Sequence, residues 1–463
     1  MLNYDIIKQV MEKIKSFETQ KSTSEIFENS SPRIIEKFTP NNAEEAKTEF
    51  FENRNLDKPN NFYEKLNQSE IDEFYENLSL AAKTVFKDEN LGEIERELLS
   101  QQIETRSKFA AMLQAVIDFR EAKNPSKKSR AEFIFMKNNI ETNGEPEKST
   151  FESLLGEKLA KIKNIEFGET GEKLRAELFE LLDEDYSQFA GERFQPKQET
   201  VESFGEMARD FYSEQLKFIP EKPAGEKYSA QEIFEIFEKI TGDFEQKSGF
   251  SPFEIEWKKS GAISVNSADK KIKIPENRAP VSKSKLEGLV VHEIGTHYYR
   301  AQIGEKYGIS PLKLGLDGYL DTEEGIARTM EMSVAGKFEE AGIPHYLTAG
   351  LAYFEGKNFR EVFEANWRLY TLEKSKNGEI TDEEISKQKD LAFRNTQRIF
   401  RGTDELPWFK DLSYFNGGQK VWKYIEENID SPTLFDELLL GGKSNLLDKN
   451  QQKSIYELKV GKR

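Results

Sequence analysis

Apolar residues recur with helical spacing through the first half of the chain. Ile71, Phe74, Tyr75 and Leu78 are separated by one to three positions, and similar patterns continue to about Phe211. This spacing places the apolar side chains on one face of an α-helix. We therefore predict that the first half of the protein is built from amphipathic helices.

A break follows at residues 218–228, "FIPEKPAGEKY", where two prolines and a glycine interrupt the pattern. Proline and glycine disfavour helix interiors, so this segment is predicted to be a loop. Ser229 comes directly after it, with Glu232 three residues later. This pairing is typical of a capping box and predicts a new helix beginning at Ser229.

The period of the apolar residues then changes from about 3.6 to 2, which is the period of a β-strand. The alternating positions are Phe253, Ile255 and Trp257, then Ile263 and Val265, then Ile272 and Ile274. The stretch "VNSADKKIKIP" contains a predicted turn between two strands. We expect a small antiparallel sheet, followed by a helix that Ser284 and Glu287 cap.

A chain of 463 residues exceeds the size at which a single hydrophobic core stops growing. We predict an N-terminal lead-in segment over residues 1–40, with a short helix at Tyr4–Phe17. A helical domain follows over residues 41–222, and a catalytic region occupies residues 223–463. The fold class is predicted to be α+β and mainly α-helical.

Composition narrows the functional class. The formal net charge is −17, which argues against nucleic acid and against an anionic membrane surface. The absence of cysteine excludes disulfides, a thiol nucleophile and cysteine-ligated zinc. The N-terminus has no apolar signal region, and no apolar run is long enough to span a membrane. We therefore expect a cytoplasmic protein without a membrane partner.

The stretch "VVHEIGTHYYR" contains His292 and His297, two of the three histidines in the chain. It resembles the zinc motif HExxH with one extra residue. On a regular α-helix, side chains five residues apart diverge by about 140°, too far for both imidazoles to reach one ion. We predict a π-bulge around Ile294–Thr296, where Gly295 makes a backbone irregularity least costly. The alternative is an ordinary charged helix with two solvated histidines.

A third ligand is available in "GYLDTEEGIA", where Glu324 follows His297 by 27 residues. His292, His297 and Glu324 would then hold one Zn²⁺ per chain, with water in the fourth position. Zinc lowers the pKa of a coordinated water molecule, and Glu293 would accept the proton and pass it to the leaving amine. Helical projection favours Glu323 over Glu324, so the choice of third ligand stays open at this point.

These motifs resemble the HExxxH metallopeptidases, which include the microtubule-associated tyrosine carboxypeptidases. Their bacterial relatives contain a "QEGLA" motif and have been named for a supposed effect on flavohemoglobin expression. Glu324 to Ala327 align with the last four letters of QEGLA, which favours Glu324 as the ligand. "FTPNNAEEAKTEFF" and "RIFRGTDELPWFKDLSYFNGGQKVW" resemble further family blocks, so the similarity covers roughly residues 40–424. The resemblance implies a zincin-like catalytic core in which the small antiparallel sheet precedes the zinc-binding helix.

For its eukaryotic members, the family implies removal of a C-terminal tyrosine from tubulin or related tails. Tubulin tails are acidic, and a protein with a net charge of −17 would repel them. We therefore do not carry the tubulin substrate over from the resemblance.

A carboxypeptidase needs a cation for the terminal carboxylate of its substrate. Arg398 and Arg401 share one face of a predicted helix with Arg394, and they fall in a family-like block. Lys410 and Tyr414 are further candidates for substrate binding. The alternative is that these arginines pair with acidic neighbours on a solvated face.

Three other polar residues have both a functional and an ordinary interpretation. His345 would either polarise a carbonyl group or be a loop histidine, and the second interpretation is preferred. Tyr298 or Tyr299 would either donate to a developing oxyanion or pack in the core.

The sequence therefore predicts a zinc peptidase that acts on a peptide or protein C-terminus, removing tyrosine or another aromatic residue. One alternative is a metalloendopeptidase or amidase with the same zinc site. The other is a helical interaction protein without turnover. An exposed sheet edge would let a peptide bind as an added strand.

Overall fold

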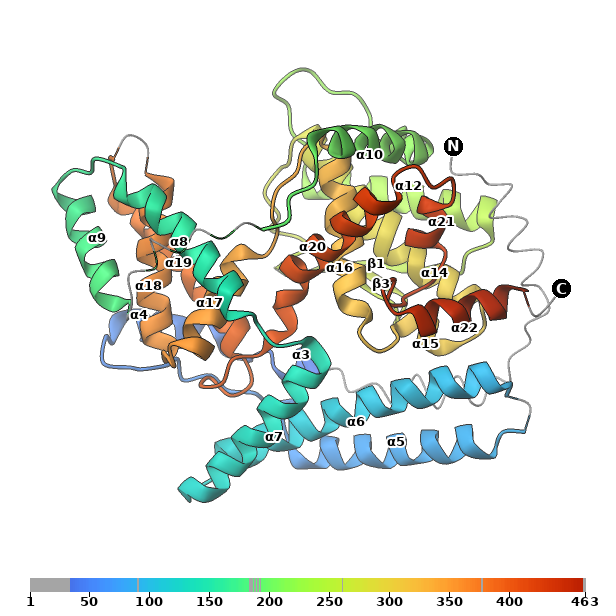
Figure 1. Ribbon diagram of the computed structural model, residues 1–463, viewed down its shortest axis with the longest axis horizontal. Helices are drawn as coiled ribbons and strands as arrows, with labels where there is room; N and C mark the ends of the chain where they lie inside the picture. The colour runs from blue at the N-terminus through green and yellow to red at the C-terminus, as the bar shows by residue number, and fades with distance from the viewer. Residues whose placement is uncertain are drawn as a thin grey trace.

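The computed structural model describes residues 34–460, except 90, 183–185, 187–188, 190, 192, 260 and 376–377. The helix predicted at Tyr4–Phe17 lies outside the described residues, as does most of the predicted lead-in. Helices dominate the described chain, and its buried apolar side chains form three main clusters. Figure 1 shows the corresponding groups of helices.

The first cluster belongs to a helical arm along the lower edge of Figure 1. Two long antiparallel helices form it, with a third helix across one end. The arm contains α3 (Ile34–Lys37), α5 (Gln68–Lys87), α6 (Glu93–Glu121) and α7 (Pro125–Asn143). Leu406 and Trp408, from much later in the chain, complete this cluster. The arm is thereby attached to the segment that leads into α20.

The second cluster fills the helical group on the left of Figure 1. Its aromatic core is centred on Phe50, whose ring contacts those of Phe359, Phe363 and Phe393. The elements are α4 (Ala43–Glu52), α8 (Lys148–Lys163), α9 (Glu169–Leu181), α17 (Ile343–Phe354), α18 (Phe359–Lys374), α19 (Asp382–Phe400) and the 3₁₀ helix η3 (Phe409–Leu412).

The third cluster is the largest and holds the histidine motif. Its strands are β1 (Glu254–Lys258), β2 (Ser264–Asn266) and β3 (Lys271–Pro275). The first of its helices are α10 (Gln198–Phe211), α11 (Ser213–Leu216), α12 (Ala230–Ser248), α13 (Lys283–Leu289) and the π-helix η2 (Val290–Tyr298). They are followed by α14 (Tyr299–Lys306), α15 (Ser310–Leu314), α16 (Tyr319–Val334), α20 (Ser413–Asn428), α21 (Leu434–Leu439) and α22 (Lys449–Val460).

The mainly helical α+β class is confirmed, but the prediction of an antiparallel sheet was wrong in one respect. The strand order is β1-β3-β2, in which β3 pairs with β2 antiparallel and with β1 parallel. The predicted hairpin is therefore present between β2 and β3. After β1, the chain crosses to the other edge of the sheet to form β2. It then returns as β3, which lies between β1 and β2. Alternating apolar residues define a strand but do not reveal the direction of its neighbours.

Helix starts follow local capping chemistry. The capping box of Ser229 and Glu232 is confirmed at the start of α12. The predicted cap at Ser284 was wrong, because Ser282 caps α13 and accepts from the backbone N–H of Lys285. Val281 is held in an isolated bridge with Tyr228, so the extended backbone ends there and the helix begins two residues earlier than predicted.

Elements from both sides of residue 222 share a core, since α8 and α9 pack against α17 and α18. The division into domains at that residue stays a prediction. Across the part of the chain that the structure describes, no helix is both long enough and apolar enough to cross a membrane.

Candidate metal centre

The histidine motif lies on a π-helix, η2, which joins α13 and α14 without a break. The backbone N–H of Tyr299 bonds to the carbonyl of Ile294, five residues earlier. The hydroxyl of Thr296 donates to the carbonyl of Val291 at 3.0 Å, again over five residues. The predicted widening is therefore confirmed, and it extends over the nine residues Val290–Tyr298 rather than the three predicted.

Gly295 is needed here because an aromatic ring packs directly on the backbone. A Cβ atom at this position would lie 2.5 Å from Cε1 of Tyr212. The Tyr212 hydroxyl also donates to the Gly295 carbonyl at 3.2 Å, and the tyrosine is buried. Glycine thus permits the close approach that supports the widened turn.

Gly295→Ala is expected to destabilise the fold by about 1–3 kcal/mol, because the added methyl group overpacks the contact with Tyr212. Thermal unfolding of the metal-free protein measures this as a lower midpoint. Gly242→Ala in α12 is the matched control, because a Cβ there has no atom within 4 Å. An alanine at 295 that leaves the midpoint at or above that of the control would contradict the packing argument.

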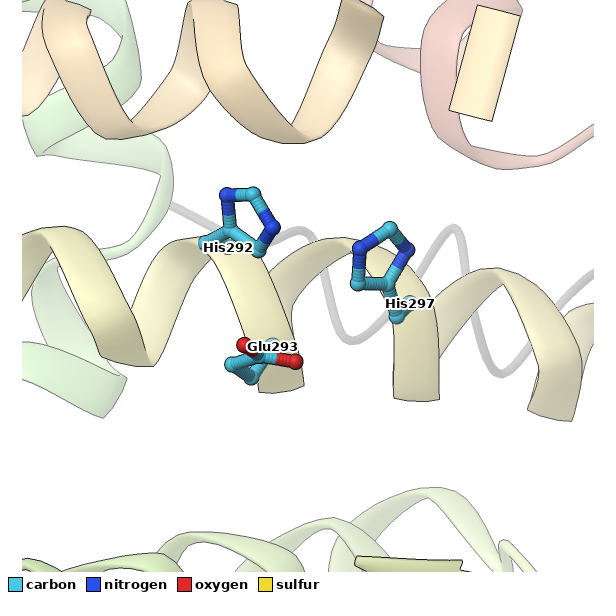
Figure 2. Close-up of side chains that lie close together, drawn as sticks. All are labelled: His292, Glu293 and His297. Atoms are coloured by element: carbon cyan, nitrogen blue, oxygen red, sulfur yellow. The ribbon is translucent and has the colours of Figure 1, made fainter. Parts of the chain in front are cut away.

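The widened helix brings His292 and His297 together. Their ring centroids are 4.9 Å apart and the rings meet edge to face. His292, Glu293 and His297 each place one potential ligand atom within 4.8 Å of the others. Figure 2 shows both imidazoles projecting from the same side of the helix, with Glu293 lower in the view. The alternative of two solvated histidines does not fit this arrangement, since both side chains are mostly buried.

Each imidazole is oriented by a carboxylate from α16. Nδ1 of His292 lies 3.1 Å from Oε2 of Glu331, and Nδ1 of His297 lies 2.9 Å from Oε1 of Glu323. An ionised carboxylate only accepts hydrogen bonds, so Nδ1 carries the proton in both neutral rings. Nε2 of each ring is therefore left as the lone-pair donor. Carboxylate partners of this kind are usual behind metal-binding histidines.

Glu323 and Glu324 lie on different sides of His297. Glu323 is 2% exposed, and its carboxylate also contacts Nε of Arg300 at 2.9 Å and Nζ of Lys443 at 3.3 Å. Burial raises the pKa of Glu323, but the Lys443 and Arg300 charges outweigh it and hold the pKa at about 2. Glu324 instead approaches from the Nε2 side of His297, at 3.8 Å. Glu324 therefore faces the free lone pair, while Glu323 is occupied behind the ring.

Glu293 is buried, with 7% of the residue exposed. Burial raises its pKa, while the two neighbouring histidines oppose that change. Burial lowers the pKa of His292, but the hydrogen bond to Glu331 and the charge of Glu293 outweigh burial. The pKa of His292 is therefore raised above its ordinary value. The site thus concentrates carboxylates around two imidazoles, as expected of residues that bind a cation.

The predicted substrate-binding cations surround one buried carboxylate. Arg398 donates two hydrogen bonds to Asp411, at 2.9 and 2.8 Å. Arg401 and Lys410 lie 3.5 and 3.6 Å from the same carboxylate. The alternative, in which the arginines pair with an acidic neighbour, therefore fits Arg398 and Arg401. Three cations nevertheless share this single carboxylate, so positive charge remains in excess. Arg394 is exposed.

This cation cluster (Arg398, Arg401 and Lys410) adjoins the metal centre through Tyr414. The charge of Glu324, followed by burial, raises the pKa of Tyr414. Its ring lies 6.1 Å from that of His345, whose pKa burial lowers to about 4. His345 is therefore neutral near pH 7. Tyr298 and Tyr299 are buried against Phe244 and Phe250, which fits the packing interpretation for both.

A cavity of about 640 Å³ begins at Lys410. The N-terminal end of α16, including Leu320 and Asp321, forms one wall, and residues of α20 form another. A third wall comes from residues 142–150, between α7 and α8. Lys410 is the one member of the cation cluster (Arg398, Arg401 and Lys410) that lines this cavity.

Three residues that shape this site were not predicted from the sequence. Glu331 lies seven positions after Glu324 on α16, and this helical spacing was the one available signal for it. Asp411 and Lys443 have no such signal, because their partners are brought to them only by the tertiary fold.

A family model described as microtubule-associated tyrosine carboxypeptidase matches residues 176–462, which is more than half of the chain. The matched range contains the π-helix, α16 and the cation cluster, whereas the cavity wall at 142–150 lies before it. No curated protein matches the sequence. The earlier resemblance is confirmed, and the chain belongs to the microtubule-associated tyrosine carboxypeptidase family.

Proposed function

We propose that this protein is a zinc-dependent carboxypeptidase. The observation that carries the proposal is the pair of adjacent imidazoles, with Glu324 3.8 Å from Nε2 of His297, beside a cation cluster with excess positive charge. A metal centre next to such a cluster suits a substrate whose scissile bond lies close to a free carboxylate. Membership of the family supports the carboxypeptidase activity itself.

The donor set fits zinc. Two imidazole nitrogens and one carboxylate oxygen form a usual ligand set for catalytic zinc, which keeps one position open. The hydrogen bonds to Glu331 and Glu323 leave Nε2 of both histidines free for this purpose. Bound to these residues, a zinc ion would lower the pKa of a coordinated water molecule and would polarise the substrate carbonyl.

Glu293 performs the proton transfers in this proposal. Its carboxylate lies beside both imidazoles and is free of ion-pair partners within the described chain. It accepts a proton from the attacking water and donates it to the nitrogen of the departing residue. The burial that raises its pKa also suits a group that must hold a proton briefly.

The cation cluster would bind the terminal carboxylate of the substrate. Arg398 is the most accessible member, with a side chain that is 40% exposed, and Tyr414 lies under its guanidinium group. We propose that the released residue is tyrosine or another aromatic residue, in line with the family description. The cavity that Lys410 lines would provide space next to the cation cluster.

Elemental analysis and peptide cleavage together test the proposal. We expect about one zinc per chain, and release of a C-terminal tyrosine from peptides with a free carboxylate. The same peptides with an amidated C-terminus should be cleaved at least about 100-fold more slowly, because a charged hydrogen-bond partner is lost. Equal cleavage of both sets would favour an endopeptidase or amidase. Absence of zinc after supplementation would leave the non-catalytic interaction protein as the better interpretation.

A further inference from the structure

Two buried hydroxyl groups donate to backbone carbonyls inside the π-helix. Oγ1 of Thr296 donates to the carbonyl of Val291 at 3.0 Å, and the Tyr212 hydroxyl donates to the carbonyl of Gly295 at 3.2 Å. Thr296 is 0% exposed and Tyr212 is 1% exposed. None of these four residues is a proposed zinc ligand or the proposed base, so the mechanism described above does not use either hydroxyl.

The hydrogen bond of Thr296 depends on the π register. Where a threonine in an α-helix bonds to its own helix, the hydroxyl usually donates to the carbonyl four residues earlier. The α-helices of this protein contain such bonds at Thr48, Thr84, Thr105, Thr241, Thr348 and Thr371. Thr296 instead donates five residues back, which is the spacing of hydrogen bonds in a π-helix. The bond to Val291 therefore forms in the widened helix and would be lost in a regular α-helix.

Tyr212 contacts the same segment from outside it. It directly follows the last residue of α10, and its ring lies so close to Gly295 that a Cβ there would be 2.5 Å from Cε1. The ring contact and the hydrogen bond together fix the orientation of Gly295 about the helix axis. Because Gly295 lies between His292 and His297, this contact also constrains the turn that connects the two histidines.

A π-helix of nine residues needs stabilising contacts of this kind. Most π-helical segments are single-turn bulges within α-helices, and longer ones are rare. Glu331 and Glu323 orient the two imidazole rings from α16, but they bond to the side chains and not to the helix backbone. The hydroxyls of Tyr212 and Thr296 act on the backbone itself, so they stabilise the register on which the positions of both rings depend.

We propose that Tyr212 and Thr296 are positioning residues that hold the π register and thereby set the separation of the His292 and His297 imidazoles. This proposal rests on the proposed zinc centre. Both residues act through the backbone and neither would touch the ion. Loss of their hydroxyls should let the segment relax toward an α-helix, in which side chains five residues apart diverge by about 140°.

The test removes each hydroxyl with little change in side-chain shape. We expect Tyr212→Phe and Thr296→Val each to bind zinc about 10–100-fold more weakly than the wild type, the usual effect of losing a residue that supports a metal ligand. The double variant should bind zinc more weakly still. The d–d absorption spectrum of the cobalt-loaded variants should also change, because this spectrum reports the arrangement of the ligands. Thr296→Ser keeps a hydroxyl and should restore zinc affinity to near the wild-type value.

Two matched controls separate positioning from general stability. Tyr307→Phe removes a buried hydroxyl that donates to the carbonyl of Leu440, and Thr241→Val removes one that donates to the carbonyl of Phe237. Tyr307 and the apolar face of α12, the helix of Thr241, belong to the same hydrophobic cluster as the π-helix. Both controls should lower the thermal midpoint as the test variants do, but they should leave zinc affinity and the cobalt spectrum unchanged.

Crystal structures of the metal-free variants provide a readout that requires neither zinc nor turnover. In them, the ring centroids of His292 and His297 should lie farther apart than 4.9 Å. If the wild-type protein bound zinc but cleaved no peptide, the carboxypeptidase function would be rejected and the positioning role would stand. If it bound no zinc, a wider ring separation in the variants would still support that role. Zinc affinity equal to that of the controls, with the π-helix retained in the double variant, would overturn the proposal.

Discussion

Glu293→Gln is expected to abolish peptide hydrolysis while the zinc content stays at the wild-type level. Glutamine has nearly the same shape but cannot accept the proton from water. Loss of a general base typically lowers kcat by about 10²–10⁴-fold. Glu293 is not among the proposed ligands, so the imidazoles and Glu324 should keep the metal. The measurements are kcat on a tyrosine-terminated peptide and elemental analysis of the same preparation.

Glu287→Gln is a suitable control, since it makes the same chemical change on α13, two turns earlier in the chain. Glu287 lies 4.0 Å from Arg209 and from Lys283, so both ion pairs are long, and both cations are largely exposed. Its activity and stability should match those of the wild type. Retained turnover in Glu293→Gln would reject Glu293 as the base, and loss of zinc in that variant would make it a ligand instead.

Glu324→Ala and Glu323→Gln are expected to have different effects on zinc content and on stability. Removing the Glu324 carboxylate takes away the third proposed ligand, so zinc content should fall well below one per chain. The metal-free protein should keep its thermal midpoint, because no described lysine or arginine forms an ion pair with Glu324, whose contact is with Nε2 of His297. Zinc titration measures the metal affinity, and thermal unfolding in the presence of a chelator measures the stability of the metal-free protein.

Glu323→Gln should instead lower the stability of the metal-free protein by about 3–5 kcal/mol, because it breaks a buried ion pair. The positive charges of Arg300 and Lys443 would then lack their shared carboxylate. Zinc affinity should fall by a further factor of about 10–100, the usual effect of losing a residue that orients a ligand. If zinc were lost only in Glu323→Gln, Glu323 would be the metal ligand and the role proposed for Glu324 would be wrong.

Local features of the fold were readily predicted from the sequence. Five-residue spacing between His292 and His297 is incompatible with one ion on an α-helix, so the π-helix followed from geometry. Alternating apolar residues located all three strands, because a two-sided strand must repeat every second residue. The capping box at Ser229 was equally local.

Features that depend on distant partners were not predicted. Lys443 reaches Glu323 from a segment after α21, and no periodic signal in the sequence connects them. Asp411 neutralises part of the cation cluster, although within "FKDL" it looks like an ordinary surface residue. The parallel pairing of β1 with β3 depends on the chain path between strands. The choice between Glu323 and Glu324 likewise needed the orientation of the His297 ring.

Arg300 ties the end of the chain to the metal centre. Its guanidinium group contacts Glu323 and also donates to the carbonyls of Leu438 and Ser444, at 2.7 and 3.0 Å. Lys443, from the same segment, completes the contact with Glu323. A truncation before residue 434 would therefore remove the lysine that balances Glu323 and the carbonyls that hold Arg300. The segment from Leu438 to Ser444 is part of the scaffold that fixes the His297 imidazole, so shortened versions of the protein should retain it.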